Sequence, residues 1–187
     1  MMQYRTKDRT KLITKLLAVC KELRDLNNYN TMMGIIAGLN MSSVSRLKQT
    51  FAGLKRATTD MIKQYQLLLD PAASFKTLRS SIKASGGNIL PYIGVSLSDI
   101  TFMDDGNPDM VTTEDGESYP NMEKYQLLTT AISNVKQYQT AAYRIAPVPT
   151  LYGYLVELPC LTESMLYNLS LEREPRDPNG TLRGSSR

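Results

Sequence analysis

The acidic residues between positions 104 and 117 are the side chains of this sequence best suited to act on a charged group. Asp104 and Asp105 follow a run of apolar and small residues, and Gly-Asn-Pro-Asp comes directly after them. An EF-hand calcium loop counted from Asp105 would place Met110 where its turn glycine belongs and Gly116 where its bidentate glutamate belongs. The spacing therefore predicts no calcium site. Taken alone, these acids are typical of solvated side chains near a helix end and turn.

The composition excludes most other chemistry. The chain has no histidine, which rules out His-dependent triads, imidazole acid-base catalysis and His-ligated metals. The two cysteines, Cys20 and Cys160, cannot complete a zinc site. Glycine-rich phosphate loops of the Walker and dinucleotide-binding types are also absent from the sequence. We therefore expect no metal, no cofactor and no nucleotide site in the chain itself.

Length and charge indicate one soluble domain. The chain has 187 residues, of which 42% are hydrophobic and 21% are charged. This length is enough for one domain with a hydrophobic core and too short to suggest two domains. The 22 basic residues outnumber the 18 acidic ones but form no stripe, so the sequence disfavours a nucleic-acid partner. Apolar runs such as residues 34–39 are too short to insert into a membrane, and no apolar signal segment opens the chain. We expect a cytoplasmic protein with both cysteines buried.

Apolar periodicity predicts an all-α fold. A first helix over residues 8–26 carries an apolar stripe at three- and four-residue steps, formed by Leu12, Leu16, Cys20, Leu23 and Leu26. Asn27 or Asn30 is expected to cap a second, centrally placed helix. A longer helix over residues 58–69 ends at Asp70-Pro71.

The second half of the sequence predicts a pair of helices separated by a polar segment. The apolar run that follows Pro91 ends at Gly106, a polar loop covers about 109–120, and a long helix follows over roughly 122–139. We expect an antiparallel helical hairpin within residues 91–139 that stands away from the core. If the first of these helices forms, Thr101 and Asp105 lie on one face of it, because they are four residues apart.

The ordered set of segments resembles a known protein family. Four blocks occur in order: "LRDLNNYNTMMGIIAGLNMSSVSRLKQTF", "PYIGVSLSDITFMDDGNPD", "VKQYQ" and "LSLEREPR". They are similar to the signature blocks of the catalytic module of Ras-type guanine nucleotide exchange factors, the RasGEF family, and the match covers roughly residues 10–176. The family's module has further helices upstream of the first block. We therefore expect the C-terminal part of the module, with residues 1–176 as a partial RasGEF domain and 177–187 as a disordered tail.

The resemblance implies a function for the acid-ended helix. In this family the matching hairpin is inserted beside the nucleotide of a small GTPase, which opens its switch I. Asp105 and Thr101 match the two hairpin positions that the family directs at the magnesium and phosphate site. The implied activity is release of GDP from a GTPase of the Ras, Rap or Ral group. Because no covalent bond changes, the resemblance implies a regulatory exchange factor and no enzyme in the usual sense.

The resemblance also implies a set of GTPase contacts. Tyr92 and Ser98 match positions that contact switch II, and Met33 and Asn40 match positions that line the same groove. Phe102 stands where the son-of-sevenless type has a lysine, Gly106 belongs to the retained "GNPD" turn, and Glu163 is the acid expected to meet a basic switch II residue.

An alternative of a different class remains, namely a truncated or degenerate module that binds a GTPase or another protein without exchange. The missing upstream helices favour this alternative, whereas Asp105 and the "GNPD" turn favour exchange.

Overall fold

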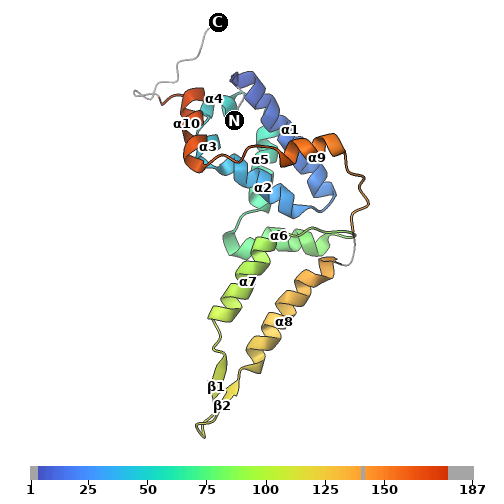
Figure 1. Cartoon of the computed structure of the whole chain (residues 1–187), viewed down its shortest axis with the longest axis vertical. Helices are drawn as coiled ribbons and strands as arrows, with labels where there is room; N and C mark the ends of the chain where they lie inside the picture. The colour runs from blue at the N-terminus through green and yellow to red at the C-terminus, as the bar shows by residue number, and fades with distance from the viewer. Residues whose placement is uncertain (1–3, 140–141, 177–187) are drawn as a thin grey trace. The chain divides into compact units, whose positions relative to one another are not determined.

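Helices make up most of the chain in the computed structural model, which describes residues 4–139 and 142–176 (Figure 1). The first elements are α1 (Thr6–Asp25), α2 (Tyr29–Asn40), α3 (Ser42–Ser45), α4 (Lys48–Ala52), α5 (Arg56–Leu68) and α6 (Ala72–Ala84). They are followed by α7 (Ile93–Asp105), β1 (Met110–Thr112), β2 (Ser118–Pro120), α8 (Met122–Lys136), η1 (Gln137–Gln139), α9 (Pro149–Val156) and α10 (Glu163–Arg173). The all-α prediction is confirmed, and the predicted disordered tail lies outside the described residues.

The chain divides into two compact units. Unit 1 contains the described residues 4–20, 35–65 and 146–176, and unit 2 contains 21–34, 66–139 and 142–145. Unit 1 therefore holds α3, α4, α9 and α10, and unit 2 holds α6, α7, α8 and the two strands. No helix within the described residues is long and apolar enough to cross a membrane.

The first helix buries a different face from the predicted one. Its buried residues are Arg9, Ile13, Leu17 and Cys20, whereas Leu12 and Leu26 are about two-fifths exposed, at 39% and 41%. The apolar residues of α1 allow two overlapping stripes, and periodicity alone does not choose between them. The buried stripe is the one that begins with Arg9, whose side chain has partners inside unit 1.

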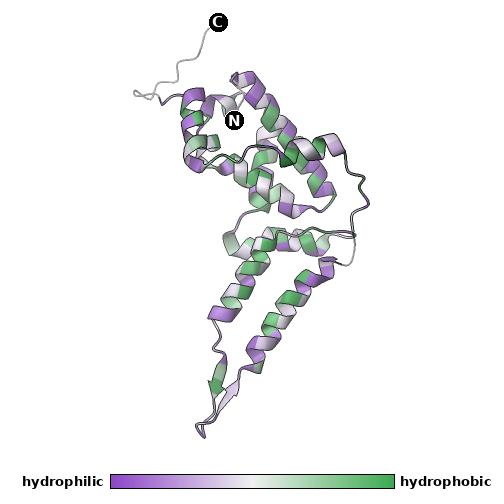
Figure 2. Ribbon diagram, viewed as in Figure 1, coloured by the Kyte–Doolittle hydropathy of each residue, from purple (hydrophilic) through white to green (hydrophobic). Residues whose placement is uncertain are grey.

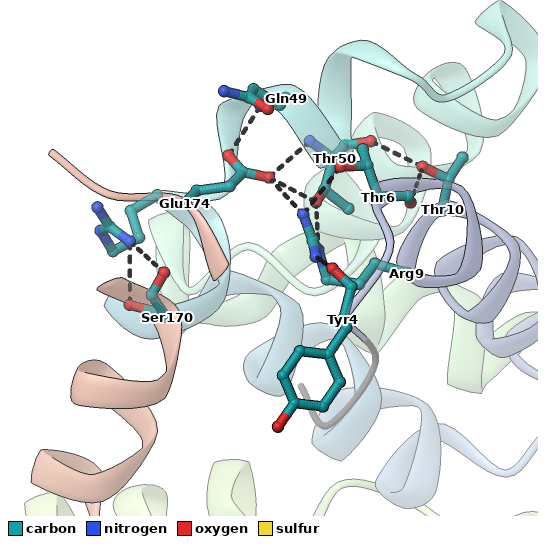
Figure 3. A network of polar contacts seen from close by, with 9 residues as sticks. Tyr4, Thr6, Arg9, Thr10, Gln49, Thr50, Ser170 and Glu174 are labelled. Atoms are coloured by element: carbon teal, nitrogen blue, oxygen red, sulfur yellow. Dashed lines mark hydrogen bonds and ion pairs between the residues drawn. The ribbon is translucent and has the colours of Figure 1, made fainter. Parts of the chain in front are cut away.

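Those partners form a buried polar network in unit 1, shown in Figure 3. Glu174, which follows α10, accepts hydrogen bonds from the backbone N–H groups of Gln49 and Thr50, each at 2.9 Å. The Arg9 guanidinium donates to the Glu174 carboxylate at 3.1 Å and to the Thr50 hydroxyl at 2.8 Å. Since Arg9 and Glu174 are 3% and 5% exposed, each charge depends on the other for compensation.

In unit 2, the residues of the "LNNYN" segment begin α2. The side-chain oxygen of Asn28 accepts the backbone N–H of Thr31 at 3.0 Å, so the cap comes from Asn28. The prediction of Asn27 or Asn30 as the cap was wrong. Asn27 instead adopts a left-handed conformation, with φ of 55°, which asparagine tolerates better than most residues.

The same segment binds the stretch of chain that leads into α7. The Tyr29 N–H donates to the Leu90 carbonyl at 2.9 Å, and the Leu90 N–H donates to the Asn27 carbonyl at 3.0 Å. The Asn27 side chain donates to the Gly86 carbonyl at 3.0 Å. The start of α2 and the entry to α7 are therefore held together by backbone and side-chain hydrogen bonds.

The segment that was predicted as a polar loop is a two-stranded antiparallel ribbon that joins α7 to α8 (Figure 1). Val111 pairs with Tyr119, and the turn between the strands includes Gly116 at φ of +83°. Since β-branched and aromatic residues flank a turn that ends in glycine, the sequence contained a weak hairpin signal within a segment of polar composition. The predicted helical hairpin is present as α7, the ribbon and α8.

The two cysteines also differ from expectation. Cys20 is fully buried in α1, and burial raises the pKa of its thiol to about 11. Cys160 is exposed, so the prediction that both thiols are buried was wrong. Cys160 lies in the connection between α9 and α10, where most side chains are exposed.

Candidate functional site

One exposed stripe of α7 contains four of the nine predicted site residues. Ser98, Thr101, Phe102 and Asp105 follow one another at helical steps, and all four are exposed. Figure 2 shows α7 changing from apolar to polar toward the end that meets the ribbon. Phe102 is 76% exposed, so its ring is accessible to a partner.

The Thr101 hydroxyl is already used within the helix. It donates to the Leu97 carbonyl at 3.0 Å, which is the backbone bond that threonine commonly makes inside helices. The hydroxyl is thus turned toward its own backbone. Thr101 therefore offers a partner mainly its methyl group.

The three acids near the end of α7 have different surroundings. The Lys124 ammonium, at the start of α8, pairs with Asp104 at 2.7 Å and with Asp109 at 2.5 Å. Among the described residues Asp105 has no hydrogen bond or ion pair, and its side chain is exposed. Of these three carboxylates, only that of Asp105 is left uncompensated.

Lys124 is itself unusual, because it is only 5% exposed. Its hydrogen bonds with Asp104 and Asp109 raise the pKa of its ammonium group, so the lysine stays charged at neutral pH. A cation in the first turn of a helix is unfavourable next to the positive end of the helix dipole. The two aspartates offset this cost.

Asn121 completes the connection between the ribbon and α8. Its side-chain oxygen accepts the Lys124 N–H at 3.2 Å and caps the helix. Its side-chain amide donates to the Pro108 carbonyl at 2.9 Å, and its own N–H donates to the Asp109 carbonyl at 2.8 Å. These contacts join Asp104, Pro108, Asp109, Asn121 and Lys124 where the two helices meet the ribbon, and we call this place the tip.

Gly106 allows α7 to end tightly. A Cβ atom added there would lie 2.8 Å from the Phe102 carbonyl oxygen, closer than real Cβ atoms approach. The Gly106 N–H donates to that same carbonyl at 3.0 Å. Gly106 therefore closes the helix directly after Asp105, and its role as a direct GTPase contact stays a prediction.

The middle of α7 is fixed to α6 by Arg79, which binds Asp99. Its guanidinium donates to both carboxylate oxygens of Asp99, at 2.8 and 2.7 Å. Its Nε donates to the Ser74 carbonyl at 2.7 Å. Ser74 is the middle of three consecutive non-glycine residues at positive φ, Ala73 to Phe75, a conformation that is costly for L-residues.

Tyr92 directly precedes α7 and is half-buried. Its ring lies 6.0 Å from the Phe75 ring, tilted by 59°. A Cβ atom at Gly94 would lie 2.5 Å from the Tyr92 ring. The absence of a side chain at Gly94 therefore permits the observed position of Tyr92.

A cleft of about 610 Å³ lies between α6, α7 and α8. Arg79, Asp99, Met103, Leu127 and Ala131 are among the residues that line it.

The other predicted contacts lie elsewhere in the chain. Met33 is half-buried on α2 in unit 2. Asn40, the last residue of α2, and Glu163, the first residue of α10, are exposed and belong to unit 1. The structure thus groups Ser98, Thr101, Phe102 and Asp105 on one helix, and the roles of all the predicted contacts remain predictions.

Two comparisons with known proteins bear on the class of this domain. The sequence profile of the RasGEF domain matches residues 1–163. The chain is 39% identical over 180 residues to Ras guanine nucleotide exchange factor R of Dictyostelium discoideum, covering 96% of this chain and 10% of that protein. It is 36% identical over 174 residues to factor J of the same organism, covering 92% of this chain and 21% of that protein.

A mammalian protein matches as well. Ras-specific guanine nucleotide-releasing factor 2 of Mus musculus is 34% identical over 171 residues, which is 91% of this chain and 14% of that protein. An all-helical domain with a helical hairpin is therefore matched over most of its length by a single family. The chain belongs to the RasGEF domain family. It spans between 10% and 21% of the length of the three relatives named here.

Proposed function

We propose that this chain promotes GDP release from a small GTPase of the Ras superfamily by placing Asp105 near the magnesium and phosphate site of the partner. Membership of the RasGEF family and the similarity to Ras guanine nucleotide exchange factors support a Ras-type partner. The activity requires no covalent step. The exchange module lowers the barrier to dissociation by binding the nucleotide-free partner more tightly than the nucleotide-bound one.

A carboxylate is suited to this task for electrostatic reasons. The β- and γ-phosphates of a nucleotide in a GTPase are held by a lysine and by Mg²⁺. A carboxylate that approaches this site competes with phosphate for the lysine and perturbs the oxygen ligands of the cation. Both the metal and the nucleotide then dissociate faster.

The observation that carries the proposal is the difference between Asp105 and its neighbours. Asp104 and Asp109 share the Lys124 ammonium, whereas Asp105 is exposed and has no ion pair among the described residues. A carboxylate already paired with lysine would have to break that pair before it could act on a partner. Asp105 pays no such cost.

The test is the rate of fluorescent-GDP release from a panel of Ras, Rap and Ral GTPases. We expect Asp105→Ala to slow release about tenfold, the effect of losing about 1.4 kcal/mol of transition-state stabilisation. Binding to the nucleotide-free GTPase should change little, because the contacts made elsewhere on the surface remain. Asp115→Ala is the matched control, since Asp115 is an exposed acid in the ribbon turn and has no part in the proposed site.

Equal release rates for Asp105→Ala and Asp115→Ala would contradict the proposed role of Asp105. A wild-type chain that binds a nucleotide-free GTPase but accelerates release from none would favour the alternative, a module that binds without exchange. In that case Asp105 is a solvated acid at the end of a helix.

A further inference from the structure

We infer that Lys124 is a positioning residue for exchange, because it holds the end of α7 in place and leaves Asp105 as the acid available to the partner. This inference rests on the proposed function and adds a residue to it. Lys124 lies on α8 and is not predicted to touch the GTPase. It acts through the two aspartates that it binds.

The contacts of Lys124 connect three segments of the hairpin. One aspartate, Asp104, belongs to the last turn of α7, and the other, Asp109, lies between α7 and β1. The lysine itself belongs to the first turn of α8. A single ammonium thus fixes the end of one helix, the connection after it and the start of the next helix.

Burial makes this connection specific. The Lys124 side chain is 5% exposed, whereas its partners Asp104 and Asp109 are 59% and 70% exposed. A buried ammonium is costly unless a negative charge is paired with it. We therefore expect Lys124 to stay bound to its aspartates whenever this part of the hairpin is folded. Because Asp104 belongs to the last turn of α7, its pair with this ammonium restricts the rotation of that turn.

The rotation of that turn decides which acid points outward. Successive residues of an α-helix are about 100° apart around the axis, as 3.6 residues per turn require. With Asp104 turned toward Lys124, Asp105 is directed to the exposed stripe of α7 that also holds Thr101 and Phe102. Without Lys124 the end of the helix would lose this constraint.

Two variants with opposite effects on charge test the inference. Lys124→Met adds one net negative charge to the tip and removes the connection. The double variant Asp104→Asn with Asp109→Asn removes two negative charges and also removes the connection. If positioning is decisive, both variants slow GDP release about tenfold at saturating GTPase, with little change in the concentration of half-saturation. If acid charge alone were decisive, the two variants would change the rate in opposite directions.

Two further variants serve as controls. Lys124→Arg keeps a cation that can reach both aspartates and should retain release within about twofold of wild type. Lys63→Met makes the same substitution at an exposed lysine of α5, outside the four sequence blocks, and should leave release unchanged. Hydrogen exchange at the Gly106 and Asn121 amides reports on the tip directly, and both amides should exchange faster in Lys124→Met.

The outcomes separate this inference from the proposed function. A wild-type chain that accelerates no GTPase overturns the proposed function and the role of Lys124 with it. An active wild type whose Lys124→Met variant matches Lys63→Met overturns the inference alone. Opposite changes for the two charge variants would also overturn it, because charge would then outweigh position.

Discussion

Adjacent residues of one helix can have opposite roles. Asp104 and Asp105 are chemically identical, yet one is paired with a buried ammonium and the other is exposed and unpaired within the described chain. Ser98 and Asp99 differ in the same way, because Asp99 binds Arg79 while Ser98 lies on the exposed stripe. A function that depends on one carboxylate is thus protected from interference by its neighbours.

The position of the Tyr92 ring provides a test at this scale. A methyl group at Gly94 would lie 2.5 Å from that ring, so Gly94→Ala must displace it. If Tyr92 contacts the GTPase, Gly94→Ala should weaken binding to the nucleotide-free GTPase severalfold, in the same direction as Tyr92→Ala and by less. Titration with fluorescently labelled GTPase measures this affinity.

Gly153→Ala is the control for this substitution. Gly153 is also a helical glycine, on α9, and a Cβ there would meet nothing within 4 Å. Affinity should therefore not change in this variant. Unaltered affinity in both Gly94→Ala and Tyr92→Ala would remove Tyr92 from the binding surface.

Among the elements, the helices were easier to predict than the faces they bury. Periodicity located α1, α5, α7 and α8 to within a few residues. It gave the buried face of α1 only in part: Cys20 is buried as predicted, but Ile13 and Leu17 belong to a second apolar stripe that periodicity does not distinguish from the first. The ribbon was missed because its strands are three residues long and fully exposed.

The candidate site was predictable only in part, for a similar reason. The exposed stripe follows from the spacing of Thr101 and Asp105 together with the family resemblance. Lys124 was overlooked because lysine is usually exposed, and only its placement in the first turn of a helix hinted at acidic partners. Its partners precede it by 15 and 20 residues, which no local pattern reveals.

At the level of elements, the attachment of α7 to α6 leads to a further prediction. Arg79→Met removes the pair with Asp99 and the hydrogen bond to the Ser74 carbonyl, whereas Asp99→Asn weakens only the pair. Because the pair is partly exposed, each variant should lose no more than about 1 kcal/mol of stability. The rate of GDP release should fall more in Arg79→Met than in Asp99→Asn, because Arg79→Met also removes the hydrogen bond to the turn of positive-φ residues around Ser74. Thermal unfolding and nucleotide release measure the two effects, and equal release rates would dismiss the contribution of the turn.

At the scale of the whole molecule, each unit is held by contacts between distant parts of the sequence. In unit 1, residue 9 binds residue 174. In unit 2, Asn27 binds the chain at Gly86, and Tyr143 donates to the Leu26 carbonyl at 2.7 Å. Neither unit is a continuous stretch of sequence, so an internal cut in the chain would separate partners of the same unit.

The buried pair in unit 1 gives the prediction for stability. Arg9→Met leaves the Glu174 carboxylate buried without its cation, and should lower the free energy of unfolding by roughly 3–5 kcal/mol. Adding Glu174→Gln removes the unpaired charge, so the double variant should be more stable than the sum of the single effects predicts. Urea unfolding of the four proteins completes the cycle. Strictly additive losses would show that the two charges are not coupled.

The length of α7 acts as a lever arm. Its 13 residues extend about 20 Å at 1.5 Å per residue, with Tyr92 at one end, Asp105 at the other and the Arg79–Asp99 pair midway between them. A tilt of about 5° about the Tyr92 end therefore moves Asp105 by roughly 1.7 Å, and a shift of about 1 Å can change a rate 100-fold. Small adjustments around Tyr92, where a partner is expected to bind, would be magnified at the carboxylate. The rate of GDP release would then be limited more by how precisely the angle of α7 is fixed at the Tyr92 end than by the chemistry of the carboxylate at the other end.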